Sequence, residues 1–216
     1  ISTLQRASGI NPHEVAELAC QLIAGLEDGG IMSCATNFPG HGDTSQDSHE
    51  QLAFLSHTRK RFEECEFLPF RRAIAQGVPA IMTAHLFAPL LDPNHPATTS
   101  HIITTSILRA QLGFRGLIVT DDLLMRGISD LMPIPAAAVR SVQAGADMLI
   151  VSKDFDIQRE SVEALKRAFD EGGISSLRLQ DSLERISQVK KRYCQFPESP
   201  PPLCSIGSKK HQLVLR

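Results

Sequence analysis

The sequence predicts an α/β protein built on a parallel β-sheet. Four short segments are apolar without regular alternation, which is typical of strands buried on both faces: 31–36, 80–85, 117–121 and 148–151. Each is followed by a segment whose apolar residues recur at helical spacing. Strands that alternate with helices need crossover connections, and these place the helices over a parallel sheet.

The expected helices are bounded by residues that favour helix ends. The first helix should begin after Asn11, with Pro12 in its first turn and Gly29 at its end. A second helix is expected at 62–77, with a break near Pro69 because proline has no N–H to donate. The remaining helices are expected at 99–114, 135–146, 157–173 and 176–193.

The end of the chain differs in composition from the rest. Residues 196–216 include the proline-rich stretch "FPESPPPLC", which favours an extended and flexible conformation. The two helices before it are amphipathic, as expected for helices that cover a sheet. We therefore expect one α/β domain over residues 1–195, in which Ser100 caps the third helix, followed by a flexible segment.

Composition limits the classes of partner. The 216-residue chain is 42% hydrophobic and 21% charged, so it can bury a sizeable core. Its formal net charge of -2 and its dispersed basic residues argue against nucleic acid and anionic membranes as partners. Aromatic residues that could stack on bases are scarce, with no Trp and one Tyr. No apolar run approaches the roughly 18 residues of a membrane-spanning helix.

The cysteines and the first residue bear on cellular location. Five cysteines occur in no CxxC pair, and their number is odd. Reduced thiols in a cytoplasmic protein are therefore expected, rather than a disulfide framework. The chain opens with Ile1 instead of Met, which is typical of a sequence whose true N-terminus lies upstream.

Polar residues gather where the predicted strands end. Asn37, His85, Asp121 and Ser152 each lie at or directly after one of the four strands. The carboxyl ends of parallel strands carry the active site in (β/α) barrels and the ligand site in open doubly wound sheets. The sequence contains neither GxGxxG nor GxxxxGK[ST], which argues against the nucleotide-binding version.

The stretch "NFPGHGDTSQDSH", residues 37–49, is the most polar of these strand ends. Asp47 precedes His49 by two residues and can fix its tautomer and raise its basicity, which suits the imidazole to proton transfer. For an isolated Asp-x-His, a turn with a solvent-exposed histidine is the more common interpretation. Both interpretations stay open on these residues alone.

Asp121 ends an otherwise apolar strand in "GLIVTDD". A carboxylate at that point can serve as a nucleophile, a base or a metal ligand, although it can also cap the next helix, a role that Asp122 fits better. Ligand-type residues are present, but none has the fixed spacing of a metal site, so neither a metal nor another cofactor is expected.

Several stretches together resemble the family 3 glycoside hydrolases, and in particular their β-N-acetylhexosaminidase branch. They are "NFPGHGDTSQDSH", "LPFRRAI", "AIMTAHL", "PATTS", "LRAQLGFRGLIVTDDLLM" and "AGADMLIV", in this order, and the likeness covers about residues 4 to 192. The resemblance implies a parallel (β/α)8 TIM-type barrel. It also implies removal of a terminal β-linked N-acetylglucosamine from an oligosaccharide, with retention and through a glycosyl-enzyme.

The resemblance also implies roles for individual residues. Asp121 matches the nucleophile of the family, and Asp47 with His49 matches an acid/base dyad. Arg6, in "LQRASG", matches a sugar-binding arginine. Three strand-end residues complete the predicted substrate site: Thr36, Asn37 and His85.

Two departures from the family pattern matter. The family has Lys-His where this chain has Thr36-Asn37, and each lost charge-assisted hydrogen bond costs about 1.5 to 3 kcal/mol. Only four strands are predicted, whereas a barrel has eight and typically takes about 250 residues. The chain thus resembles the C-terminal part of a barrel, and a fragment, a truncated gene product and a degenerate relative stay open. Open sheet edges would favour self-association.

Three functions follow from these observations. The first is a β-N-acetylhexosaminidase whose activity is reduced. The second is a catalytically silent relative that binds a glycan or a protein partner. The third is phosphorolysis, since an imidazole repels incoming phosphate less than a carboxylate does. The family implies muropeptide fragments or chitooligosaccharides as substrates, and the sequence does not choose between them.

Overall fold

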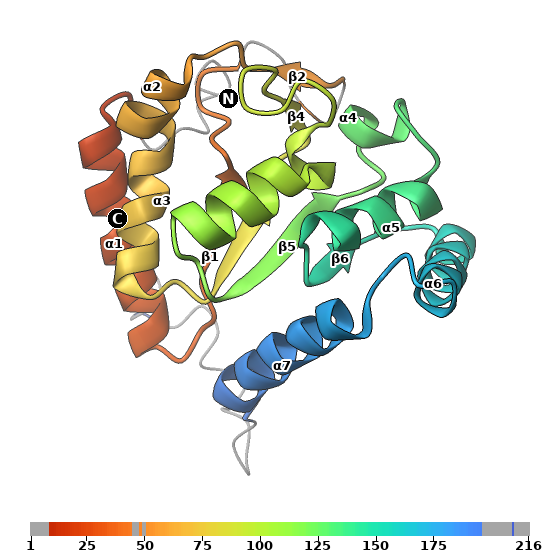
Figure 1. The fold of residues 1–216 in the computed structure, drawn as a ribbon. Coiled ribbons are helices and arrows are strands. Elements are labelled where there is room, and N and C mark those ends of the chain that lie inside the picture. Colours follow the sequence, from red (N-terminus) through yellow and green to blue (C-terminus); the bar gives the residue numbers. More distant parts are fainter. Residues whose placement is uncertain (1–8, 45–47, 49–50, 196–208, 210–216) are drawn as a thin grey trace.

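The computed structural model describes residues 9–44, 48, 51–195 and 209 (Figure 1). Its main sheet has four parallel strands in the order β1-β3-β5-β6. The strands are Cys34–Phe38 (β1), Ala80–Thr83 (β3), Leu117–Asp122 (β5) and Met148–Ile150 (β6). The prediction of a parallel sheet in an α/β fold is confirmed, and all four predicted strands are present.

The helices alternate with these strands along the chain. The α-helices are α1 Pro12–Asp28, α2 Arg59–Arg61, α3 Phe67–Gln76, α4 Arg126–Ser129, α5 Ile134–Ala144, α6 Phe155–Asp170 and α7 Ser176–Tyr193. Three further helical segments are η2 Phe62–Glu66 and η4 Ile102–Gln111, both π-helical, and η3 Ala97–Thr99, a 3-10 turn. No described helix is both long enough and apolar enough to cross a membrane.

The predicted ends of the first helix are confirmed. The Asn11 side chain accepts a hydrogen bond from the N–H of His13 at 2.9 Å, and Gly29 is the C-cap of α1. A turn follows the end of α1. Gly30 has a φ of +72°, and the N–H of Ile31 donates to the carbonyl of Leu26 within the helix. Strand β1 therefore begins at Cys34 rather than at residue 31.

The break expected at Pro69 takes another form. Pro69 is the third residue of α3, and the π-helical turn η2 lies directly before this helix. The helix thus changes type ahead of the proline instead of ending. Ser100 acts as expected, since its hydroxyl accepts a hydrogen bond from the N–H of Ile103 at 3.0 Å. The predicted flexible segment 196–216 lies outside the described residues, apart from Lys209.

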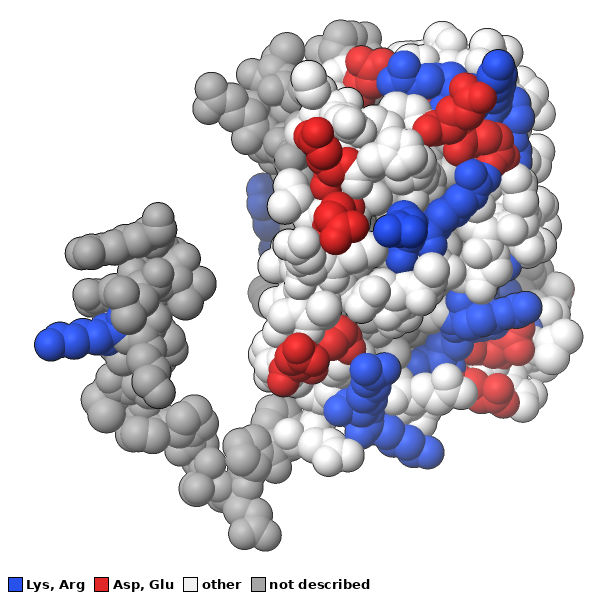
Figure 2. Space-filling model, turned by 90° about the vertical axis from the view of Figure 1, so that its left-hand side faces the viewer, with Lys and Arg blue, Asp and Glu red and all other residues white. Residues whose placement is uncertain are grey.

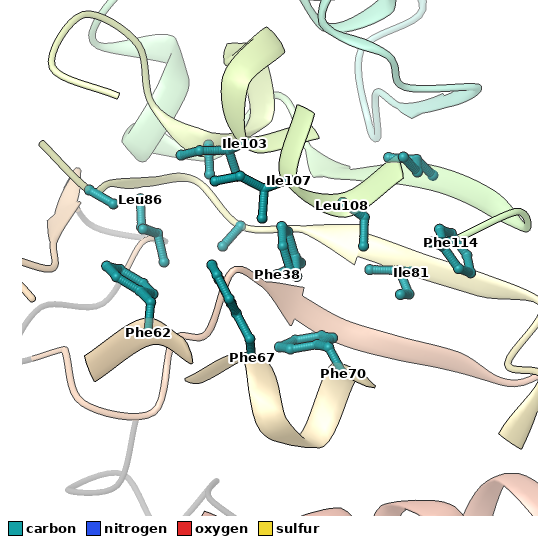
Figure 3. Packing of buried hydrophobic residues seen from close by; sticks show 14 of the residues in the cluster. Phe38, Phe62, Phe67, Phe70, Ile81, Leu86, Ile103, Ile107, Leu108 and Phe114 are labelled. Carbon is teal, nitrogen blue, oxygen red and sulfur yellow. The ribbon is translucent and has the colours of Figure 1, made fainter. Parts of the chain in front are cut away.

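The main core lies between the sheet and the helices η2, α3 and η4 (Figure 3). Phe38 at the end of β1 is fully buried there, stacked on Phe67 at 5.6 Å and edge-on to Phe70 at 5.1 Å. Ile81 and Ile118 enter the same core from β3 and β5. Large apolar side chains therefore hold the carboxyl ends of the strands at fixed positions.

The opposite face of the sheet is less covered. Met82, Val119 and Met148 are in register across β3, β5 and β6, and alternation directs them away from the core that holds Ile81 and Ile118. Met82 and Val119 are half-buried, and Met148 is exposed. A second sheet pairs Ala53–Phe54 (β2) with Leu86–Phe87 (β4) in parallel. On the face seen in Figure 2, acidic and basic side chains are interspersed.

Candidate active site

The structure places Asp121 at the C-terminal end of β5, as predicted. One carboxylate oxygen, Oδ2, accepts a hydrogen bond from Asn37 Nδ2 at 2.9 Å. The other oxygen, Oδ1, accepts from the backbone N–H of Asp122 at 2.8 Å. Because an ionised carboxylate has about four acceptor positions, each oxygen keeps room for another partner.

Asn37 reaches Asp121 from β1, across the intervening strand β3. Its neighbour Phe38 is fixed in the core, so the backbone of Asn37 cannot move freely. Thr36 is exposed, whereas Asn37 is half-buried. The two residues that differ from the family pattern thus occupy different environments.

His85 lies just beyond β3 and is fully buried. Its Nε2 is 2.9 Å from the carbonyl oxygen of Asp122, and its Nδ1 is 2.8 Å from the hydroxyl of Thr98. Since a carbonyl can only accept, Nε2 carries the proton and Nδ1 accepts from Thr98. Burial lowers the pKa of His85, so the neutral ring is favoured. The predicted contact of His85 with the sugar stays a prediction, because the structure shows the ring engaged within the protein.

The hydroxyl of Thr98 also lies 2.9 Å from the carbonyl of Ala84. The Thr98 hydroxyl has only one proton to donate. When the neutral His85 ring carries its proton on Nε2, Nδ1 is an acceptor, so Thr98 donates its proton to Nδ1. The hydroxyl of Thr83, 3.3 Å away, can then donate to Thr98. Two threonines and a histidine thereby form a continuous chain of hydrogen bonds that ends at the backbone of Asp122.

The interpretation that Asp122 caps the following helix is wrong. Helix α4 has Met125 at its N-cap position, and Asp122 Oδ1 accepts instead from the N–H groups of Leu124 at 3.1 Å and Ser152 at 3.2 Å. The Ser152 hydroxyl also donates to Asp122. Burial raises the pKa of Asp122, but these hydrogen bonds outweigh it and the net pKa is lowered. Asp122 therefore ties β5 to the segment after β6.

The polar stretch after β1 is anchored to this strand end. Ser48 is buried; its hydroxyl lies 3.1 Å from His41 Nε2, and its carbonyl accepts from the N–H of Gly127 at 3.1 Å. An added Cβ at Gly127 would lie 3.1 Å from that carbonyl and 3.0 Å from His85 Cβ, so this close approach favours glycine. Asp47 and His49, on either side of Ser48, lie outside the described residues, as does Arg6. Their predicted roles stay predictions.

A second set of charged groups holds the start of this stretch. Asp43 lies 3.0 Å from His57 Nε2 and 3.6 Å from Arg61, which also pairs with Glu66 at 3.0 Å. Gly40 has a φ of +133°, and a Cβ there would lie 2.8 Å from Glu66 Cβ. His57 and Arg61 belong to no motif, so the sequence does not predict their position beside this stretch. Among the residues that the structure describes, no three His, Cys, Asp or Glu side chains gather as a metal site would require.

Comparison with known proteins identifies relatives that match most of the chain. The profile described as "Glycosyl hydrolase family 3 N terminal domain" matches residues 3–189. A β-hexosaminidase of Nitrosomonas eutropha is 36% identical over 187 residues, which are 85% of this chain and 53% of that protein. The chain thus spans about half the length of this relative.

Solved structures agree with this relationship. A glycoside hydrolase family 3 β-N-acetylglucosaminidase from Paenibacillus sp. str. FPU-7 has a TM-score of 0.92 at 36% identity, and the match covers 97% of this chain and 41% of that one. The β-glucoside phosphorylase BglX has a TM-score of 0.87 at 26% identity, covering 96% of this chain and 39% of that one. From the profile match and these similarities together, the chain belongs to glycosyl hydrolase family 3.

Proposed function

We propose that the chain takes part in the hydrolysis of terminal β-linked N-acetylglucosamine residues by a retaining mechanism. The observation that carries this proposal is Asp121 at the end of β5, with each carboxylate oxygen held by one donor. Its support is the similarity to a named β-hexosaminidase and to a β-N-acetylglucosaminidase structure. These enzymatic relatives favour a glycosidase over a silent glycan-binding or protein-binding relative.

In the proposed first step, Asp121 attacks the anomeric carbon and forms a glycosyl-enzyme ester. The protonated imidazole of His49, oriented by Asp47, donates its proton to the departing glycosidic oxygen. In the second step the neutral imidazole takes a proton from water, which displaces Asp121. An imidazole in place of a second carboxylate avoids placing two anions next to each other.

We further propose that the four strands are part of a (β/α)8 barrel. The parallel order, the helices between strands and the strand-end site all fit the C-terminal face of such a barrel. Eight strands would require four more than the main sheet contains within the described residues. The reaction is therefore proposed for the chain in its completed barrel, and a cytoplasmic location stays a prediction that cell fractionation can test.

Thr36 and Asn37 are expected to weaken sugar binding. In place of a cation and an imidazole they offer a hydroxyl and an amide, and Asn37 already donates to Asp121. The expected loss is about 1.5 to 3 kcal/mol per charge-assisted hydrogen bond. Slow turnover is thus the expected behaviour of the unaltered chain.

Phosphorolysis is the second candidate, favoured by the similarity to a β-glucoside phosphorylase. Here a phosphate oxygen, instead of water, attacks the anomeric carbon of the glycosyl-enzyme. The ester bond to Asp121 breaks, the carboxylate is regenerated and the product is a glycosyl 1-phosphate. The two reactions share the first step and differ in the acceptor of the second.

The test is an assay of the protein with its barrel completed, on 4-nitrophenyl N-acetyl-β-D-glucosaminide, with and without phosphate. Release of the β-anomer, followed by NMR, would support retaining hydrolysis, and a sugar 1-phosphate would support phosphorolysis. Asp121→Ala should abolish either reaction because it removes the nucleophile. Binding of chitooligosaccharide without turnover would support the silent relative. Equal rates in Asp121→Ala would contradict the proposal.

A further inference from the structure

We infer that Asn37 is a positioning residue that orients the nucleophile Asp121 and so sets the rate of glycosyl-enzyme formation. The inference rests on the proposed function and goes beyond it, because the sequence predicts Asn37 only as a contact to the sugar. Asn37 stands where the family has histidine, and we assign it a contact with another side chain of the protein, Asp121, in addition to the sugar.

The geometry of the contact fixes which atom of Asn37 faces Asp121. Nδ2 lies 2.9 Å from Asp121 Oδ2, and an ionised carboxylate can only accept, so the amide must present its N–H2 group. The backbone N–H of Asp122 holds the other oxygen at 2.8 Å. Two donors from different directions define the plane of the carboxylate, whereas the backbone donor alone would leave its rotation less restricted.

Both ends of this arrangement are anchored. On one side, Phe38 is locked in the aromatic core next to Asn37. On the other side, His85 donates a hydrogen bond to the carbonyl of Asp122, and the Ser152 hydroxyl donates one to the Asp122 carboxylate. The donor and the acceptor therefore belong to rigid strand ends, which is the condition for a preorganised catalytic group.

The absence of charge on Asn37 suits the proposed reaction. The amide orients the carboxylate without adding a charge of its own beside it. The carboxylate of Asp121 stabilises the oxocarbenium-like transition state and forms the new bond to the anomeric carbon.

The reagent for the test is a 5-fluoro-N-acetylglucosaminyl fluoride. The carboxylate of Asp121 forms a C–O bond to the anomeric carbon while the C–F bond breaks and fluoride leaves with the electron pair. Fluoride departs with little need for a proton, so the labelling rate reports on the nucleophile and depends little on Asp47 and His49. Intact-protein mass spectrometry follows the label, and peptide mapping locates it.

Three variants separate positioning from simple stability. Asn37→Leu has similar size but no donor, and should slow labelling by about 10- to 100-fold. Asn37→His keeps an N–H donor and should label faster than Asn37→Leu. Asn37→Asp places a second carboxylate beside Asp121 and should label more slowly than wild type at neutral pH. Asn94→Ala, on an exposed loop, is the matched control and should label as wild type.

Two results would overturn the inference. One is an Asn37→Leu protein that melts like wild type and labels at the wild-type rate. The other comes from NMR of the Asn37 side-chain amide, assigned by comparison with Asn37→Leu. Its signals should move in Asp121→Ala, and unchanged signals would show that the contact is absent. A wild-type protein that keeps the contact but takes no label would refute the proposed function and with it the catalytic part of this inference.

Discussion

His85 makes part of the stability depend on pH. Burial is the main reason that its pKa is lowered, and the hydrogen bond to the Asp122 carbonyl offsets this only in part. The charges of Asp121 and Asp122 also favour protonation, and His41 opposes it. An unfolded histidine takes up a proton below about pH 6.5, while the folded His85 stays neutral to lower pH. Stability is therefore complete above this pH and falls as the pH drops below it.

We expect His85→Gln to reduce this dependence. Glutamine offers an N–H donor for the Asp122 carbonyl and an oxygen acceptor for Thr98, but it does not titrate. The wild-type Tm should fall more steeply than that of the variant between about pH 7.5 and about pH 5.5. Thermal melts across this range give the comparison, and parallel curves would contradict the prediction.

Restoring the family pair should raise activity. Thr36→Lys with Asn37→His adds a cation and an imidazole at the end of β1, both able to form charge-assisted hydrogen bonds with sugar hydroxyls. The expected gain in kcat/KM on the aryl glycoside is about 10- to 100-fold. Adding Asp121→Ala to the double variant should abolish the activity, which controls for contaminants. No gain would mean that these positions do not limit sugar binding.

At this scale the sequence predicts single residues better than contacts. Asp121 was found because a carboxylate ends an apolar strand, and the structure places it there. Its contact with Asn37 joins residues 84 positions apart, and it depends on strand order and on the register shift between β1 and β3. No periodicity encodes such a pairing. Asp47, His49 and Arg6 stay predictions.

At the scale of elements, the sequence predicts what a long apolar pattern can mark. The four buried strands and the amphipathic helices follow from such patterns. The strands β2 and β4 have two residues each, too few to show a period. The π-helical turns were also missed, because their residues have the same apolar spacing as an α-helix.

Helix α7 is held to the sheet by a buried ion cluster. Asp147 directly precedes β6, and its side chain is fully buried. Its carboxylate accepts hydrogen bonds from Arg178 at 2.8 Å, Ser182 at 2.9 Å and Arg185 at 3.2 Å. Arg109 also pairs with it, and burial lowers the pKa of Arg109 to about 10, against the opposing effect of Asp147. Arg109 therefore remains charged at neutral pH, and all three arginines pair with the same carboxylate.

We expect Asp147→Ala to destabilise the protein by about 3–5 kcal/mol, because three partly buried cations lose their partner. Chemical denaturation followed by circular dichroism gives the free energy of unfolding. Asp156→Ala is the matched control, since Asp156 pairs with Arg159 at an exposed site on α6 and should cost less than about 1 kcal/mol. Equal losses in the two variants would refute the role of the cluster.

At the scale of the whole molecule, strand number is predictable but closure is not. An apolar strand has the same composition in an open sheet as in a barrel. Whether the sheet closes depends on partners for β1 and β6, and within the described residues each of these strands pairs on one side only. Each outer edge therefore leaves N–H and C=O groups without a strand partner in this part of the chain.

A second copy of the chain offers both edges a partner. Four parallel strands from each of two copies make eight, and a two-fold axis along the barrel keeps all of them parallel while β1 of one copy meets β6 of the other. Met148 on β6 is 40% exposed, and it lies in register with the half-buried Val119 on the less covered face. Covering several hundred Å2 of such surface would be worth on the order of 10 kcal/mol.

We therefore expect the isolated chain to self-associate edge to edge, with a dimer as the smallest closed form. Size-exclusion chromatography with light scattering should give a mass above the 23.7 kDa of one chain, increasing with concentration. Met148→Lys places a charge at the β6 edge and should shift the distribution toward the monomer, because edge lysines oppose strand pairing. A monodisperse monomer with a sharp, cooperative melt would contradict the prediction. Such a result would mean that the open edges of β1 and β6, and the sheet face that carries Met148, are stable in a single chain.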